Sequence, residues 1–486
     1  MHSTRIRWLC SCALVLCASQ VGAAAAQQPP DPTAQPRDAA QPAQAPTQPR
    51  PLNPTQEVAG QQPEGNAIEV GPAKLRLGGW VGLTALHRST NGGGGTGTAF
   101  ASIPYPDTLQ GNVSETRLTA ESSRLSIRID ADFPEARFRS LAGYFEMDFS
   151  GAAQNNAEVT TGGVGLRMRH AFAEVRYGES FYMSAGQAFS LMTPEKDQLS
   201  MWPSDMDLSQ AVDTNYVAGL LWGRYPQLRL TWRPSRTFNW AVSVENPEQQ
   251  IGQGVVALPS CCVSDIDALF NIGSNQTSVP NPVPDIAARV ALNPNAKVHV
   301  GAGGVIRVFR NSVAPYTDSF KQVGGGASID AAVRATKTTR VVLQSGFGPG
   351  LGRYIGGLVP DVVFHADGSI SPVFAASWVT GVEQRVTERT SLAGYYSGVA
   401  TRSNYAQDVG GSYIGFGYPG GPNSNNRKIQ ELTGTFSTLT VATENRGSAQ
   451  VAVQVSWLER EPWSQGSGPP SANAIMFFVQ VRYNLP

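Results

Sequence analysis

Residues 227–233 alternate strictly between polar and apolar side chains. An extended chain would place two leucines and a tryptophan on one face and two arginines, a glutamine and a threonine on the other. Residues 170–177 show a similar pattern, with His170, Glu174 and Arg176 on one face. A soluble sandwich would have to point such polar faces into its core, whereas a barrel in lipid turns them toward a water-filled interior. This pattern favours a transmembrane β-barrel.

The chain offers no segment from which a transmembrane helix is expected. After residue 26, no run of about 18 apolar residues occurs in the 486-residue sequence. A chain that spans lipid without such helices must close its strands into a barrel, because lipid offers unpaired backbone groups no hydrogen-bond partner. The 37 basic and 37 acidic residues balance, so the charge gives no support to a nucleic-acid partner.

Residues 1–26 have the features of a secretory signal peptide. Basic residues precede an apolar run over residues 8–18, and small residues at 21–26 suit a cleavage site. A lipoprotein signal at Cys17 is the alternative, although the bulky Leu16 before it does not suit that signal. The sequence therefore predicts export.

Removal of this peptide would leave two of the five cysteines, Cys261 and Cys262. Adjacent cysteines can form a vicinal disulfide in an oxidising compartment, where they would staple a loop. Neither a further cysteine nor a histidine lies nearby in the sequence. We therefore expect no metal site at this pair.

Residues 27–72 are rich in proline, glutamine and alanine and contain few large apolar residues. Such a segment cannot offset the entropy of ordering, so we expect a disordered linker. A spacer is the simple interpretation of this linker, and contact with a cell-wall polymer is the alternative. The remaining residues, 73–486, form the expected barrel domain.

The barrel domain divides into about sixteen segments with strand character. We expect strands at residues 74–87, 116–132, 138–150, 165–177, 181–190, 216–233, 238–246, 285–292, 297–310, 320–335, 340–354, 372–386, 390–402, 428–440, 449–463 and 474–485. Short turns and long connections alternate between these strands, with one connection of modest length at 311–319. Outer-membrane barrels have short turns at the periplasmic rim and long loops at the other rim. The sequence therefore predicts an all-β antiparallel barrel in a bacterial outer membrane.

Five short stretches carry a resemblance to a known family. Arg-His-Ala-Phe-Ala-Glu at residues 169–174, Ala-Gly-Gln-Ala-Phe-Ser-Leu-Met at 185–192 and Tyr-Pro-Gln-Leu-Arg-Leu at 225–230 occur in this order. Ser-Arg-Leu at 123–125 and Gly-Tyr-Phe-Glu-Met-Asp-Phe at 143–149 precede them. Together they resemble motifs of the DcaP-like trimeric porins. The resemblance implies a homotrimer of barrels with about sixteen strands each, and a channel for small anions that include dicarboxylates.

The connection at residues 191–215 is expected to fold into the barrel and narrow the channel, as the corresponding loop does in general porins. It carries five acidic residues: Glu195, Asp197, Asp205, Asp207 and Asp213. The expected inner wall carries six arginines: Arg124, Arg128, Arg176, Arg229, Arg233 and Arg482. Opposed rows of charge would set a field across the constriction, and arginine offers paired donors to carboxylate or phosphate.

Two interpretations of these arginines remain open. In the first, four of them form a ladder that attracts anions: Arg124, Arg128, Arg229 and Arg233. In the second, some arginines pair with acids in the lumen and stiffen the wall. Three such acids are expected there: Glu146, Asp148 and Glu174.

A porin is the function that these features favour. Its expected partners are outer-membrane lipid and small anionic or polar solutes, with no nucleic acid. A surface barrel that acts as an adhesin or receptor through its long loops is the alternative, and a secreted soluble all-β protein is a third possibility.

An enzyme is not expected. His170 and Glu174 share a face but have no nucleophile placed beside them. The glycine-rich runs at 92–95 and 346–352 lack the Lys-Ser/Thr pair of a phosphate-binding loop. We therefore expect neither catalysis nor a cofactor.

Overall fold

The computed structural model describes residues 67–93, 95–133, 137–151, 165–250, 255–260, 281–312, 319–443, 446–465 and 468–486. The expected signal peptide, the expected linker up to residue 66, and the pair Cys261 and Cys262 lie outside these described residues. Within the described part of the chain, no helix has both the length and the apolar character needed to cross a membrane.

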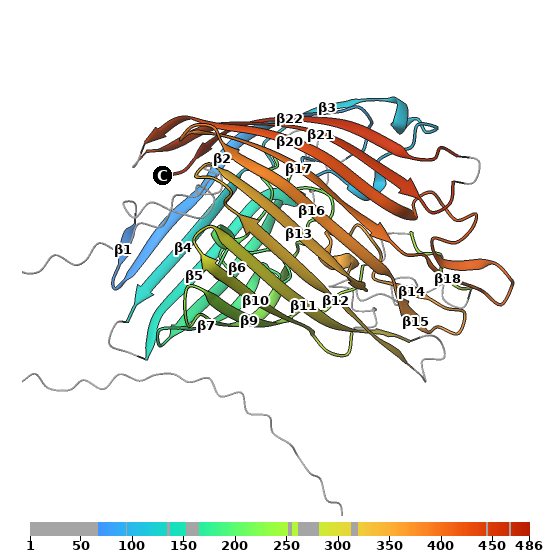
Figure 1. Ribbon diagram of the computed structural model, residues 1–486, viewed down its shortest axis with the longest axis horizontal. Coiled ribbons are helices and arrows are strands. Elements are labelled where there is room, and N and C mark those ends of the chain that lie inside the picture. Colours follow the sequence, from blue (N-terminus) through green and yellow to red (C-terminus); the bar gives the residue numbers. More distant parts are fainter. Residues whose placement is uncertain are drawn as a thin grey trace, which may run out of the picture. The chain divides into compact units, whose positions relative to one another are not determined.

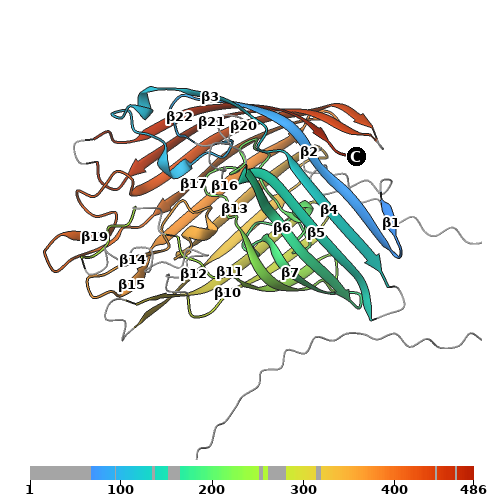
Figure 2. The same ribbon diagram turned by 180° about the vertical axis from the view of Figure 1, so that it is seen from behind.

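The wall of the protein is a closed antiparallel β-barrel of 16 strands. These are β2 (Ala73–Arg88), β3 (Glu115–Thr119) continued by β4 (Arg124–Asp132), β5 (Phe138–Gly151), β6 (Gly165–Tyr177), β7 (Phe181–Phe189), β8 (Arg224–Trp232), β9 (Phe238–Glu245), β10 (Asp285–Asn295), β11 (Val298–Asn311), β12 (Phe320–Val333), β13 (Thr339–Pro349), β16 (Phe374–Arg385), β17 (Thr390–Thr401), β20 (Asn426–Thr443), β21 (Gly447–Pro462) and β22 (Ala472–Asn484). The barrel closes where β22 pairs with β2, from Trp80 opposite Asn484 to Arg88 opposite Met476. Figures 1 and 2 show these strands running obliquely around the wall. The expected all-β barrel is confirmed.

The strand expected at 216–233 is shorter than the sequence pattern indicated. β8 begins at Arg224, and residues 216–223 belong to the preceding loop. Tyr216 and Gly219 have positive φ angles of 65° and 84°, which a strand does not accommodate. The loop therefore extends to residue 223, whereas the apolar side chains of the sequence predicted that the strand begins at residue 216.

The strand expected at 116–132 is interrupted in the middle of the wall. Residues 120–123 separate β3 from β4, and both strands pair with β2. The Ser123 hydroxyl accepts a hydrogen bond of 3.1 Å from the Gly82 N–H across this gap. A side chain thus takes the place of one backbone acceptor where the ladder is broken.

Apolar side chains cover the outer face of the barrel, and polar side chains from the wall strands point into its interior, where they share the space with apolar clusters. Leu228 and Leu230 are 44% and 41% exposed, whereas Arg229 between them is fully buried. Ile127 and Phe477, on opposite sides of the closure, are also exposed. An apolar outer band around a polar interior is the arrangement of a transmembrane barrel, so the predicted facing is confirmed.

A β-bulge in β6 turns two consecutive polar residues into the barrel. His170 lies opposite Glu146 and Met168 lies opposite Met147, so Arg169 is an extra residue without a partner. Arg169 and His170 are both buried. Strict alternation would have placed one of them against lipid.

The two ends of the barrel differ in their connections. The short turns lie at one end, where the small strand β1 (Ile68–Val70) pairs with the start of β2. The long connections lie at the other end and carry two hairpins that the sequence pattern did not indicate. These are β14 (Val362–Phe364) with β15 (Ile370–Pro372), and β18 (Asn404–Gln407) with β19 (Tyr413–Phe416). The C-terminus lies near the end that carries β1 (Figure 1).

The outward-facing position of Leu228 can be tested with a charge. The substitution Leu228→Arg places a guanidinium group in the middle of β8 against acyl chains, which is expected to lower the free energy of unfolding by about 2–4 kcal/mol. Val409→Arg, at a loop position that is 90% exposed, is the matched control and should change it by less than about 0.5 kcal/mol. Denaturant unfolding in lipid vesicles, followed by tryptophan fluorescence, measures both. Equal effects of the two variants would contradict the lipid-facing assignment.

Candidate functional site

The connection between β7 and β8, residues 190–223, runs through the interior of the barrel and is called the constriction loop below. Its backbone reaches strands on the far side of the wall. The N–H groups of Val212 and Asp213 donate to Gln454 Oε1 on β21 at 2.6 and 2.9 Å. The Ala218 N–H donates to Glu431 Oε2 on β20 at 2.7 Å. The expected inward-folded loop is therefore present.

A buried ion pair fixes the first part of the constriction loop to β8. Arg229 Nη1 lies 2.9 Å from Glu195 Oε1, and both side chains are fully buried. The same guanidinium donates to the carbonyl oxygens of Phe189 at 2.7 Å and Ser200 at 3.0 Å. These contacts occupy Arg229, which has no surface left for a solute.

Asp205 holds the next part of the loop through its own backbone. Its carboxylate accepts N–H hydrogen bonds from Asp197, Gln198 and Ser200 at 3.2, 3.1 and 2.9 Å. Asp197 is exposed, but loss of hydration inside the barrel, together with the Asp205 carboxylate beside it, raises its pKa to about 7. Arg233 Nε donates to the Gln198 carbonyl at 2.7 Å, so this predicted ladder residue also fastens the loop.

The remaining loop acids also make contacts within the protein. Asp207 Oδ2 lies 2.5 Å from Arg340 Nη2, and Arg340 Nη1 lies 3.0 Å from Glu383. The Asp213 carboxylate accepts N–H hydrogen bonds from Thr98 at 3.1 Å and from Asn215 at 2.8 Å. Four of the five acids of the constriction loop therefore anchor it to the wall, to itself and to another loop through their carboxylates. Asp197 is exposed and contributes its backbone carbonyl, which accepts a hydrogen bond from the Asn239 amide at 2.6 Å.

An internal cavity of about 130 Å³ lies between the constriction loop and the wall, and we call it the lumen cavity. Its wall side comes from β4, β5, β6, β7, β20, β21 and β22, and none of the five loop acids lines it. Its charged lining residues are Arg124, Glu146, Arg169, Lys196 and Arg482. On the loop side it is lined mainly by neutral residues that include Met206, Leu208, Gln210 and Val212.

Two arginines of the lumen cavity share one aromatic ring. The guanidinium carbons of Arg124 and Arg482 lie 5.8 and 5.0 Å from the centre of the Trp80 ring. Arg482 Nε donates to the neutral Gln450 at 2.6 Å, and no carboxylate among the described residues lies within 4.0 Å of Arg482. The carboxylate nearest to Arg124 is that of Glu146, at 3.9 Å. These two positive charges are incompletely neutralised.

The acids expected in the lumen have close partners. Glu146 Oε1 lies 2.6 Å from Arg169 Nε, and its other oxygen accepts a 2.9 Å hydrogen bond from the Tyr144 hydroxyl. Asp148 lies 2.8 Å from both Arg167 and Arg169. Glu174 accepts hydrogen bonds from Ser184 and from the Trp202 indole, both at 2.9 Å. Their charges are thus engaged with the wall and with the loop.

The last two predicted arginines lie outside the lining of the lumen cavity. Arg128 pairs with Asp130 at 2.8 Å and stacks over Trp202 at 4.3 Å. Arg176 pairs with Glu179 at 2.8 Å, next to a short turn. Of the six predicted arginines, the structure therefore brings together only Arg124 and Arg482 at the cavity.

The sequence reasoning did not single out several residues that build this interior. Arg169 enters the lumen through the bulge, and the adjacent polar pair at 169–170 was the available signal, because it breaks the alternation. Lys196, the single lysine or arginine within residues 191–215, also lines the lumen cavity. A second buried cluster joins Arg307 to Asp285 at 3.0 Å and to Asp361 at 2.7 Å. It ties the connection between β13 and β16 to the wall, and nothing local in the sequence indicated that pairing.

The described residues do not bring three or more histidine, cysteine, aspartate or glutamate side chains together in a group that could hold a metal ion. His170, considered with Glu174 in the sequence, packs against the Phe189 ring at 5.0 Å. Neither of its ring nitrogens has a hydrogen-bond partner among the described residues, so it does not bond to Glu174.

Comparisons with known proteins bear on the fold. Comparison of the sequence with protein-family models and with curated proteins gave no match. The structure is similar to the outer membrane channel DcaP of Acinetobacter baumannii, with a TM-score of 0.62 and 16% identity over 88% of this chain and 100% of that one. It also aligns with Salmonella typhi OmpF in complex with daunomycin (TM-score 0.48, 9% identity, 86% of this chain and 100% of that one). Vibrio cholerae OmpT aligns similarly (TM-score 0.47, 10% identity, 86% and 100%). The likeness to the DcaP channel confirms the fold that the sequence resemblance implied.

The anchoring role of Arg229 predicts a large loss on its replacement. Arg229→Met leaves the Glu195 carboxylate buried without its partner, which is expected to cost about 3–5 kcal/mol of stability. Arg176→Met is the matched control, because it breaks a pair whose Glu179 side chain is 72% exposed, at a cost below about 1 kcal/mol. Thermal unfolding in detergent compares the two variants, and the double variant Arg229→Met/Glu195→Gln should recover part of the loss. Similar losses for the two arginine variants would contradict the anchor.

The raised pKa of Asp197 predicts a pH dependence. Between about pH 4 and pH 7 the folded loop retains a proton that the unfolded chain releases, so the stability of the folded loop falls as the pH rises through this window. Asp197→Asn should remove that part of the dependence, whereas Asp408→Asn, on an outer hairpin, should leave it unchanged. Melting temperatures at pH 4, 5.5 and 7 test this. An Asp197→Asn variant that keeps the full dependence would rule out this residue as its source.

Proposed function

We propose that this protein is a porin of a bacterial outer membrane that lets small hydrophilic solutes, preferably anions such as dicarboxylates, diffuse through its interior. The apolar outer band supports the membrane location, because only acyl chains accept such a surface around a polar interior. The resemblance to the DcaP-like trimeric porins supports assembly as a homotrimer. The observation that carries the anion preference is the pair Arg124 and Arg482 at the lumen cavity.

Charge balance at the lumen cavity supports a preference for anions. Three arginines and one lysine line it together with a single acid, Glu146, which is already bonded closely to Arg169. An arginine that faces only a neutral amide, as Arg482 faces Gln450, keeps its attraction for a passing carboxylate. Low-dielectric walls strengthen such a field compared with bulk water.

The constriction loop shapes this field from the opposite side. Four of the five loop acids point into anchoring contacts, and none of the five lines the cavity, so the loop's face toward the cavity presents neutral side chains such as Met206 and Val212 together with Lys196. A negative row there would have compensated the arginines. In its absence the field is one-sided, and an anion meets attraction on the wall with little repulsion from the loop.

Removal of both arginines should change ion selectivity. We expect the double variant Arg124→Gln/Arg482→Gln to lower the anion-to-cation permeability ratio by up to about tenfold, because a hydrogen bond to a charged group contributes about 1.5 kcal/mol or more. Reversal potentials in planar bilayers under a salt gradient measure this ratio. Glutamine keeps much of the side-chain length and polarity while removing the charge.

Arg176→Gln provides the charge-matched control, since that residue lies beside a short turn and pairs with Glu179. It should leave the reversal potential nearly unchanged. A ratio that does not respond to the double variant would overturn the assignment of anion selectivity to this pair. An absence of any conductance in the unmodified protein, with retained binding of a ligand by its long loops, would instead favour the adhesin or receptor.

A further inference from the structure

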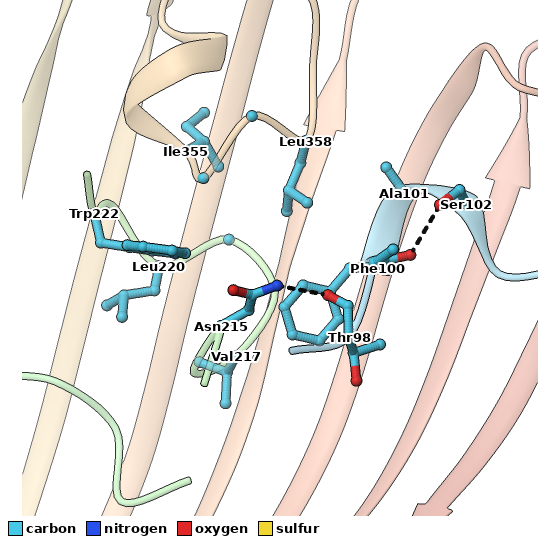
Figure 3. A pocket seen from close by; sticks show the side chains of 14 residues that line it. Thr98, Phe100, Ala101, Ser102, Asn215, Val217, Leu220, Trp222, Ile355 and Leu358 are labelled. Atoms are coloured by element: carbon cyan, nitrogen blue, oxygen red, sulfur yellow. Dashed lines mark hydrogen bonds between the residues drawn. The ribbon is translucent and has the colours of Figure 1, made fainter. Parts of the chain in front are cut away.

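Three loops enclose a second pocket, which shares no lining residue with the lumen cavity. It is formed by residues 98–102, 215–222 and 355–358, and we call it the three-loop pocket. Its volume is about 230 Å³, somewhat below the range typical of drug-sized ligand sites. Figure 3 shows Trp222 on one side and Phe100 on the other, with Asn215 between them. We propose that this pocket binds a small, flat, uncharged ring compound that carries a hydrogen-bond acceptor.

The chemistry of the lining excludes a charged ligand. No residue that lines the pocket carries a charge, and most of the side chains are apolar, including Phe100, Leu220, Trp222, Ile355 and Leu358. A carboxylate or ammonium group placed here would lose hydration and find no opposite charge among the lining residues, which costs several kcal/mol. An uncharged ring gains from burial of its faces and from contact with the two aromatic side chains.

The Trp222 ring is held in place from several directions. Its backbone N–H donates to the Tyr354 carbonyl at 2.9 Å, and residue 222 forms a bridge with Ile355. Its ring meets the Tyr216 ring edge to face at 5.4 Å, and the Arg224 guanidinium carbon lies 5.5 Å from its centre. A ligand would therefore meet a ring that is already oriented, so little ordering entropy is lost on binding.

A free donor lies at the edge of this ring. Among the residues that the structure describes, none accepts a hydrogen bond from the Trp222 indole N–H, and the side chain is only partly buried, so a ligand can reach this donor. Gly356 keeps the space beside that donor open, since a Cβ there would lie 2.9 Å from Trp222 Nε1. Its φ of 61° also disfavours other residues. An amide or carbonyl oxygen of the ligand would complete this site.

The loops that form the pocket are joined to one another. Asn215 Nδ2 donates to the Thr98 carbonyl at 3.0 Å, and the Thr98 N–H donates to the Asp213 carboxylate at 3.1 Å. The connection between β2 and β3, which contains Thr98, is therefore joined to the constriction loop by hydrogen bonds. Preformed walls of this kind distinguish a binding pocket from a gap between independent loops.

Nicotinamide is a suitable probe, because it is an uncharged ring with an amide oxygen, and nicotinate differs from it by carrying a charge. Ligand-observed NMR with the purified full-length protein in detergent should show saturable binding of nicotinamide and binding of nicotinate that is at least about tenfold weaker. Glucose, a polyhydroxylated ring, is the third arm and should bind more weakly than nicotinamide.

Two substitutions at one position separate stacking from hydrogen bonding. Trp222→Leu should weaken nicotinamide binding about tenfold, and Trp222→Phe, which keeps a ring but removes the N–H, should weaken it about threefold. Trp222→Phe also keeps the test valid if the leucine variant does not fold. Arg482→Gln, in the lumen cavity, should leave nicotinamide binding unchanged.

Several results would overturn this inference. They are the absence of saturable nicotinamide binding, equal binding of nicotinate, preference for glucose, or full binding by both Trp222 variants. Loss of binding in Arg482→Gln would place the probe in the lumen cavity instead, and would also overturn it. None of these outcomes depends on ion selectivity. The proposed porin function is therefore tested independently, by the reversal potentials described above.

Discussion

The absence of hydrogen-bond partners in lipid is the constraint on which this structure depends. It requires the backbone groups of the wall to find hydrogen-bond partners within the protein, mostly in the ladder between strands, and pairing of β22 with β2 leaves the sheet without a free edge across the wall. The same constraint sends the charged side chains inward. Because the interior then holds many arginines and acids, the protein can fix a long loop inside itself with ion pairs, in addition to the apolar side chains through which the loop packs against the wall.

The arginines of this interior have two roles, which can be distinguished by the contacts that each side chain makes. Arg229, Arg233 and Arg340 hold the constriction loop. They do so through ion pairs with loop acids or hydrogen bonds to loop carbonyl oxygens. Arg124 and Arg482 line the lumen cavity, whose single acid, Glu146, is already bonded to Arg169. Breaking an anchor and removing a solute-facing charge are therefore different kinds of change, although both concern an arginine on a barrel strand.

The sequence predicted the barrel well, because lipid and water impose a period of two on residues such as Leu228, Arg229 and Leu230. It predicted less of the site. The partner of Arg229 is Glu195, which belongs to a loop whose path depends on contacts across the whole barrel, and no local pattern identifies such a pair. The same holds for the three-loop pocket, which combines segments more than a hundred residues apart. Tyr216 shows the limit for boundaries, since its positive φ ends the strand pattern without a glycine to signal it.

The bulge at Arg169 has a consequence for how such a pore can diversify. One additional residue in β6 brings a second polar side chain into the lumen, while Met168 and Ala171 on either side keep their pairing with β5. Insertion or loss of a single codon in a wall strand can thus alter the electrostatics of the passage and leave the surface presented to the bilayer intact. Evolution of permeability and evolution of membrane fit are to that extent uncoupled in this architecture.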